Sequence, residues 1–346
     1  MRNETREKFN NYVSKLATLN LTTPSLNASN GVLLNTQVQP SVVQRMVVTM
    51  QESVAFLGNI NILLVDELAG EKVQLEITQP IASRTDTSQG ERRAEDPTTL
   101  QDRRYECQQT NFDSALPYSK IDAWAKSNDF HIRIRDAIIQ RRGLDMIMIG
   151  WNGTNAAPTT DRETYPLLQD VNVGWLQHVR NDAPQQVMDE GELGAGKITV
   201  GGADSHYQNL DALAWDLRSL FPDHIDPLYD LVALCSRSLL SSKYFGIVNQ
   251  GGGNVEALAA DKLLALPKTL GGLRAFSVPY LPDDTLVITP FSNLSIYVQE
   301  AGIRRRVMDN PRRDQVENYE SSNEAYVVED YDLIVFAEHI ELEEIA

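Results

Sequence analysis

Residues 83–91 have the sequence Ser-Arg-Thr-Asp-Thr-Ser-Gln-Gly-Glu, and they lie in a segment of about 25 residues with almost no apolar side chains. Strand-like patterns flank this polar segment. Val73, Leu75 and Ile77 share one face of residues 72–78, and a second strand is expected at residues 105–113. A structureless loop of this length is uncommon inside a compact domain. The pattern therefore predicts a hairpin arm that is ordered by contacts outside its own domain.

A second unusual element follows the arm. Residues 119–150 contain no proline and place apolar side chains at helical spacing, which predicts one helix roughly 45 Å long at ~1.5 Å per residue. Its outer face is basic, through Arg133, Arg135, Arg141 and Arg142. Two interpretations stay open: a solvated cationic face, or a ridge that docks acidic segments, within one subunit or from a neighbouring copy.

The N-terminal region predicts an element that can detach from the body. Residues 2–19 form an amphipathic pattern, with Phe9, Tyr12, Val13 and Leu16 on one helical face. Residues 19–40 lose this periodicity, are rich in Asn, Thr and Ser, and are expected to be an extended linker. An ordinary packed N-terminal helix is the alternative. A second helix is expected to begin at Pro40 and to end at Gly58.

The rest of the chain mixes helices and strands. A helix is expected after a cap at Asp204-Ser205, a buried strand at residues 231–235, and helices at 239–248 and 255–264. Strands are expected at 275–280, 285–289 and 294–299, and alternation returns over 316–340. No internal repeat and no regular strand–helix–strand rhythm is present, so the predicted class is α+β.

Composition narrows the possible functions. The 346 residues include 31 Lys and Arg and 48 Asp and Glu, so the net charge is 31 − 48 = −17. This negative net charge argues against strong electrostatic binding of nucleic acid, because neutralising phosphates requires Lys and Arg. Two distant cysteines, Cys107 and Cys235, exclude a disulfide scaffold. No apolar run approaches the ~18 residues needed to cross a bilayer, and the first residues do not resemble a secretory signal.

The motifs that could carry chemistry are weak. Gly191–Ile198 fits GxxxxGK but places Ile198 where a phosphate-binding loop needs Ser or Thr, so a surface loop is expected. The five histidines are scattered and have no metal-ligand spacing. Glu329, Asp330 and Asp332 could supply paired carboxylates for a hydrolase, but a charged strand face is the preferred interpretation. We therefore predict no catalytic, cofactor-binding or metal-binding residues.

Several long strings in this chain resemble the major capsid proteins of the peduovirus group of contractile-tailed temperate phages. The resemblance runs from the first residues to about Tyr331. The strings are Met50-Gln-Glu-Ser-Val-Ala-Phe-Leu, Asp129-Phe-His-Ile-Arg-Ile-Arg-Asp-Ala-Ile-Ile, Leu168-Gln-Asp-Val-Asn-Val-Gly-Trp-Leu-Gln, Lys243-Tyr-Phe-Gly-Ile-Val-Asn, Asn293-Leu-Ser-Ile-Tyr and Arg313-Asp-Gln-Val-Glu-Asn-Tyr-Glu-Ser.

The resemblance implies the HK97-like capsid fold and a role for each segment. Residues 1–40 would be a scaffold-like helix and arm, 41–65 a helix and strand leading into the peripheral (P) domain, and 66–113 the extended hairpin called the E-loop. Residues 114–164 would hold the P domain with its spine helix, 165–290 the axial (A) domain, and 291–346 C-terminal strands of the P domain. Maturation cleavage is expected near Asn27, Ser29, Asn30, Gly31 and Leu34.

The resemblance also implies partners. Copies of the chain would form hexamers, pentamers and an icosahedral shell around double-stranded DNA, together with a prohead protease or scaffold protein and a portal. Assembly would take place in the host bacterial cytoplasm, with no membrane and no cofactor. An encapsulin-like compartment shell is the alternative. Contacts between subunits are expected at Arg103, Arg104, Arg133, Arg135, Arg141 and Arg142.

Overall fold

The computed structural model describes residues 40–77, 98–124, 130–202, 204–222, 229–249 and 268–343, together with Ala82, Arg84 and Ile225. The expected N-terminal helix and linker, the cleavage region, the tip of the arm and the expected helix at 255–264 therefore lie outside the described residues.

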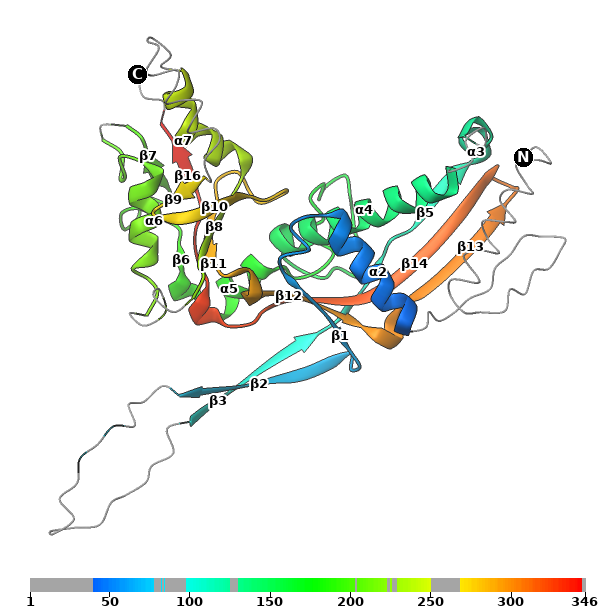
Figure 1. Ribbon diagram of the computed structural model, residues 1–346, viewed down its shortest axis with the longest axis horizontal. Coiled ribbons are helices and arrows are strands. Elements are labelled where there is room, and N and C mark those ends of the chain that lie inside the picture. Colours follow the sequence, from blue (N-terminus) through cyan, green and yellow to red (C-terminus); the bar gives the residue numbers. More distant parts are fainter. Residues whose placement is uncertain are drawn as a thin grey trace.

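A six-stranded sheet forms one half of the molecule (Figure 1). Its central path follows the order β1-β12-β14-β13, and β4 and β5 also pair with β14. The strands are β1 (Asn61–Val65), β4 (Gln108–Asn111), β5 (Ser114–Pro117), β12 (Leu294–Gln299), β13 (Arg304–Asn310) and β14 (Gln315–Val328). At 14 residues, β14 is long enough to pair with four other strands, which makes it the central strand of this sheet.

Helices pack against this sheet around the main apolar core. These helices are α2 (Pro40–Ser53), α4 (Phe130–Asn152) and α5 (Trp175–Asp182), and the short α3 (Tyr118–Trp124) follows β5. Gly143 lets α2 and α4 approach closely, because a Cβ at this position would lie 3.0 Å from Leu57 and 3.1 Å from Met50. Trp151, Trp175 and Tyr326 are among the largest fully buried side chains of this core.

A second six-stranded sheet forms the other half, in the order β6-β15-β11-β8-β10-β9. The strands are β6 (Val187–Met188), β8 (Val232–Cys235), β9 (Thr269–Leu270), β10 (Leu273–Ser277), β11 (Leu286–Thr289) and β15 (Val335–Ala337). The helices of this half are α6 (Leu210–Arg218) and α7 (Arg237–Asn249). A parallel pair, β7 (Ile198–Val200) and β16 (Ile340–Leu342), lies beside them. Four 3-10 turns connect elements of the two halves: η1 (Pro184–Gln186), η2 (Phe291–Asn293), η3 (Glu300–Gly302) and η4 (Tyr331–Leu333).

The two faces of the second sheet pack into different cores. Val232 and Leu234 of β8 belong to the main core, whereas Ala233 and Cys235 belong to a second core with α6 and α7. This division follows from the alternation of side chains along a strand. One sheet is therefore shared between both halves of the molecule.

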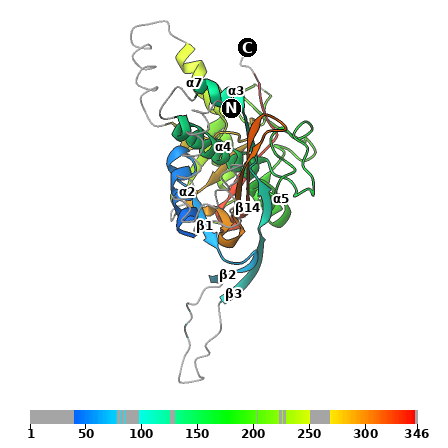
Figure 2. The same cartoon turned by 90° about the vertical axis from the view of Figure 1, so that its right-hand side faces the viewer.

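The predicted arm is present as a two-stranded antiparallel ribbon. It consists of β2 (Ala69–Ile77) and β3 (Thr98–Glu106), which pair in register from Ala69 with Glu106 to Ile77 with Thr98. In both views the ribbon extends away from the two sheets (Figures 1 and 2). The second strand begins earlier than the expected residue 105, since pairing with β2 carries Thr98–Arg104 into the strand.

The structure bears on three other details of the sequence analysis. The expected division at residue 290 separates β11 from β12, but the chain then returns: β15 and β16 join the second half, so residues 291–346 are not all strands of the first sheet. The cap of α6 is Asn209, whose side chain accepts a hydrogen bond from the Ala212 amide, rather than Asp204-Ser205. The long helix is described as α3 and α4, and the five residues between them lie outside the described part.

Candidate assembly surfaces

Several polar side chains of the arm are exposed, namely Glu71, Arg104 and Glu106. Arg104 on β3 pairs across the ribbon with Glu71 on β2 at 3.1 Å, and 78% of the Arg104 side chain is exposed. In the described part of the chain, β2 and β3 pair only with each other. A two-stranded ribbon is marginally stable on its own in water, so this arm needs support at its root or from another molecule.

The root of the arm is held by charged and aromatic contacts. Lys72 forms an ion pair with Glu329, whose carboxylate also accepts a hydrogen bond from the Tyr297 hydroxyl at 2.9 Å. Burial alone would raise the pKa of Glu329, but the hydrogen bonds from Lys72 and other side chains outweigh it and lower this pKa. The guanidinium of Arg103 lies 4.3 Å from the centre of the Tyr331 ring, a cation–π contact.

A small apolar cluster lies at the same root. The rings of Tyr105 and Tyr297 pack edge to face at 5.0 Å, next to buried Cys107. Burial is the main cause that raises the pKa of the Cys107 thiol to about 11, so the thiol is not activated. A cavity of about 300 Å³ separates the root from α5 and β14, and Asn172 and His178 line its far side. The arm is thus fixed along one side of its root and open on the other.

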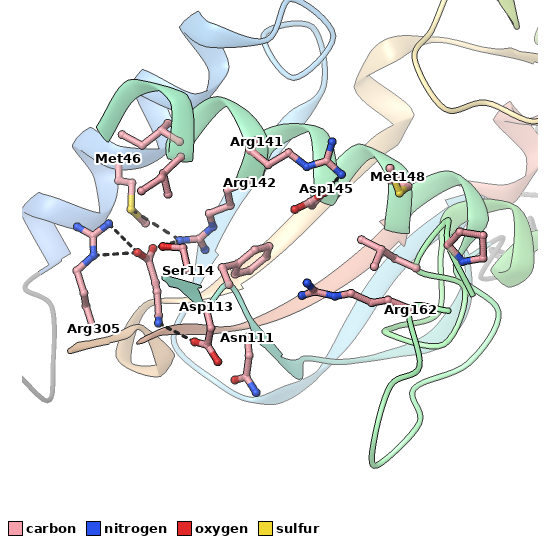
Figure 3. A pocket seen from close by; sticks show the side chains of 16 residues that line it. Met46, Asn111, Asp113, Ser114, Arg141, Arg142, Asp145, Met148, Arg162 and Arg305 are labelled. Atoms are coloured by element: carbon pink, nitrogen blue, oxygen red, sulfur yellow. Dashed lines mark hydrogen bonds and ion pairs between the residues drawn. The ribbon is translucent and has the colours of Figure 1, made fainter. Parts of the chain in front are cut away.

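The long helix α4 is joined to β14 by a buried charge network (Figure 3). Arg142 donates to Glu320, to the Ser322 hydroxyl at 2.8 Å and to Glu324 at 3.1 Å. Arg305 on β13 donates to the second oxygen of Glu320 at 2.8 Å. Burial alone would raise the pKa of Glu320, but Arg305 and Arg142 outweigh it and lower this pKa.

This network changes the interpretation of the basic helix face. Arg142 is 5% exposed and is paired with Glu320 and Glu324 of its own chain, so its side chain faces the interior. This helix face does bind acidic residues, those of β14, and the contact forms within one chain. The sequence analysis placed Arg142 on the outer face of the helix, because charged residues of a helix usually face solvent. The alternation that places Glu320, Ser322 and Glu324 on one inward face was the signal for a buried cation.

The other expected contact residues are brought to different places. Arg141 is exposed and pairs with Asp145 at 2.6 Å, one helical turn along α4. Arg133 is exposed, and the side chain of Arg135 lies outside the described part. Arg103 and Arg104 lie at the arm root and on the arm. The five arginines whose side chains are described are therefore not gathered into one surface.

A cavity of about 320 Å³ adjoins the network (Figure 3). It lies between α4, the β4–β5 connection and the loop that carries Arg162 and Leu168. Its charged lining side chains include Arg141 and Asp145, which pair with each other, and Glu320, which is held by Arg142 and Arg305. Paired charges of this kind hold elements of the structure together.

The weak motifs of the sequence have structural explanations. Residues 191–197 form a surface loop in which Glu190 accepts a hydrogen bond from the Gly194 amide at 2.8 Å, and Lys197 pairs with Glu341 at 2.7 Å. The loop leads into strand β7 rather than a helix, unlike a phosphate-binding loop. The expected strand face of Asp330 and Asp332 is wrong, because Asp330 caps the η4 turn by accepting from the Asp332 amide.

Among the described residues, no group of three or more His, Cys, Asp or Glu side chains could hold a metal ion. No helix in the described ranges is long and apolar enough to cross a membrane. The described geometry thus offers a projecting ribbon and a body built on two six-stranded sheets.

Comparison with known proteins explains this geometry. The family model described as "Phage major capsid protein, P2 family" matches residues 8–340. The chain belongs to the P2 family of phage major capsid proteins. Its function is that of a structural shell protein, and the match favours this family over the encapsulin-like alternative.

Individual members of the P2 family are similar along their whole length. The "Capsid proteins" of Escherichia phage P2 are 47% identical over 342 residues, which cover 96% of this chain and 93% of that protein. The "Major capsid protein" of Serratia phage KSP20 is 34% identical over 352 residues, covering 98% and 97%.

A solved structure agrees with the P2-family assignment and with the HK97-like capsid fold. The matching chain comes from the satellite phage P4 procapsid including size determination (Sid) protein. It superposes with a TM-score of 0.78 and 42% identity, covering 100% of both chains. The resemblance inferred from the sequence is thus confirmed for family, fold and shell function.

Proposed function

We propose that copies of this protein join into hexamers and pentamers through the arm, which reaches onto a neighbouring subunit as an E-loop. The first-sheet half corresponds to the P domain, and the second-sheet half corresponds to an A domain that packs around the capsomer axis. The observation that carries this proposal is the projecting β2–β3 ribbon, which pairs with no other strand in the described part of its own chain. A neighbouring copy would supply the missing support.

The assembled shell encloses phage double-stranded DNA without sequence-specific binding. A net charge of −17 supports this role, because a lining with few free cations makes few phosphate contacts and leaves the packaged DNA free to move. Assembly in the host bacterial cytoplasm, a portal and a prohead protease or scaffold protein complete the proposal. The protein itself acts without catalysis.

The N-terminal helix and the linker up to the cleavage region serve as an internal scaffold-like segment that is removed during maturation, and the remainder of residues 1–40 stays as an arm. Their sequence supports this role, since an amphipathic pattern is followed by an uncharged linker containing Asn27, Ser29, Asn30, Gly31 and Leu34. Exposed linkers of small and polar residues are preferred sites of proteolysis. Of the arginines proposed to contact other subunits, Arg104, Arg133 and Arg141 have exposed side chains that fit such a role.

The test is co-expression of the chain with a prohead protease and scaffold protein, followed by negative-stain microscopy and mass spectrometry of the N-terminus. We expect closed shells and a new N-terminus within residues 27–34. Monomers that never form capsomers would overturn the proposed assembly, and shells built of full-length chains would overturn the proposed cleavage.

A further inference from the structure

The margin of the first sheet formed by β1 has an open edge. β1 pairs in parallel with β12, from Asn61 with Ser295 to Val65 with Gln299. No other strand pairs with β1 in the described part of the chain. Figure 1 shows β1 beside the root of the arm. An open edge presents unpaired backbone N–H and C=O groups, which can pair with a strand from another chain.

Three other sheet margins are protected against such pairing. β13, at the opposite end of the sheet path, carries Arg304, Arg305 and Arg306 in succession, and charged side chains oppose strand addition. The margins of the second sheet, β6 and β9, are two residues long. By contrast, β1 has five residues, Asn-Ile-Leu-Leu-Val, without a charge or a proline.

Apolar side chains lie beside this edge. Ile62 and Leu64 pack against the main core, so alternation directs Leu63 to the other face, where it is 44% exposed. Leu68, just before the arm, is 47% exposed. An added strand would therefore find both backbone partners and apolar surface.

The charge pattern of the chain indicates which segment fits. Residues 16–44 form a run of 29 residues without Asp, Glu, Lys or Arg, and residues 32–38 within it are Val-Leu-Leu-Asn-Thr-Gln-Val. No proline interrupts residues 25–39. The arm segment 83–96 carries seven charged residues, which would lose hydration against an apolar edge. The uncharged segment is therefore the better match.

We propose that the β1 edge of one copy accepts residues 32–38 of a second copy as an added strand. This inference rests on the proposed function as a self-assembling shell protein and names one contact that holds the copies together. Each copy would both donate and accept a strand, which is a heterologous contact of the kind that closes rings.

The acceptor edge is tested with Leu63→Lys and the matched control Val48→Lys. Val48 is 47% exposed on α2, so both variants place a lysine at an apolar site of similar exposure. With protease and scaffold co-expressed, we expect Leu63→Lys to lower the yield of shells at least tenfold, with subunits that keep the wild-type circular dichroism spectrum. Val48→Lys should assemble as the wild type does. Equal shell yields from the two variants would overturn the proposal.

The donor is tested with Val38→Cys and Leu63→Cys in separate chains that are co-assembled and treated with a short bismaleimide. Background reaction is low, because the native thiols of Cys107 and Cys235 are buried and their pKa values are raised to about 11 and about 12. We expect a cross-linked dimer containing one chain of each kind.

Two other results would overturn the proposal. The first concerns a control chain that carries both cysteines, and it would be cross-links that form only within that chain. The second would be cross-linked dimers formed by Leu63→Cys chains alone. Shells that form without the mixed dimer would leave the proposed function intact and refute only this contact. Failure of the wild-type chain to form shells would instead refute the function.

Discussion

Two charge clusters tie the chain together at β14 and the residues that follow it, and they differ in burial. The Arg142 cluster joins α4 to the middle of the strand, where the side chains of Arg142, Glu320 and Glu324 are 0–5% exposed. The Lys72 cluster joins the arm to Glu329, just past the end of β14, where the paired side chains are 20% and 25% exposed. The difference shows that similar ion pairs have different roles. The buried Arg142 cluster holds α4 against β14 inside the body, whereas the partly exposed Lys72 cluster supports the projecting arm.

The largest effect is expected from Arg142→Met. This change leaves Glu320 and Glu324 buried with one cation fewer, which costs about 3–5 kcal/mol when one partner of a buried pair is removed. Urea unfolding of unassembled subunits measures the loss. Arg141→Met is the matched control, because Arg141 is an exposed partner in a pair one helical turn long and should cost about 0.5 kcal/mol. Similar losses in the two variants would contradict the comparison.

The pH dependence of stability should also separate the buried cluster from the rest. The folded-state pKa of Glu320 is lowered, so its stabilising contribution is present above the ordinary glutamate value of about 4.3 and is lost as pH falls through the folded value. Wild-type subunits should therefore lose stability below about pH 4.3. Glu320→Gln should be less stable at pH 7 and should show a shallower acid slope in denaturant titrations. Parallel slopes for the two proteins would contradict this assignment.

A smaller effect is expected at the root of the arm. Lys72→Met removes the ion pair with Glu329, which is partly exposed, and should lower global stability by only ~1 kcal/mol. Local opening should change more: hydrogen exchange over β2 and β3 should become faster, while exchange in α4 stays unchanged. A loss as large as that of Arg142→Met, or unchanged exchange in the arm, would show that the root does not brace the ribbon.

The smallest effect is expected from Arg104→Ala. The ion pair with Glu71 is largely exposed, so the free energy of unfolding should change by less than about 0.5 kcal/mol. If Arg104 contacts a neighbouring subunit as proposed, the variant should instead alter the yield or salt sensitivity of assembly, measured by sedimentation. No change in either measurement would remove Arg104 from the proposed contacts.

Patterns of burial made much of the fold predictable. Alternation of Val73, Leu75 and Ile77 located β2, and the apolar run at 231–235 located β8, in which all four residues are buried. The start of β3 was missed, since Thr98–Arg104 is polar and its strand state depends on pairing with β2 rather than on burial. The return of β15 to the second sheet was also missed, because long-range pairing leaves no local signal.

The candidate assembly surfaces were predictable in outline only. The polar length between two strands indicated the arm, but Lys72, Glu329 and Tyr331 meet at its root through contacts more than 200 residues apart in the chain. The open edge of β1 could not be found from its sequence, since a buried central strand has the same apolar composition. Only the sheet order distinguishes the two cases.

The shared second sheet has a mechanical consequence. Because Val232 and Leu234 face one core while Ala233 and Cys235 face the other, the strand β8 ties the two cores of the subunit together. A closed container needs its pieces to sit at slightly different tilts around five-membered and six-membered rings. We expect this subunit to behave as a stiff unit, so that differences in curvature arise at the contacts between subunits.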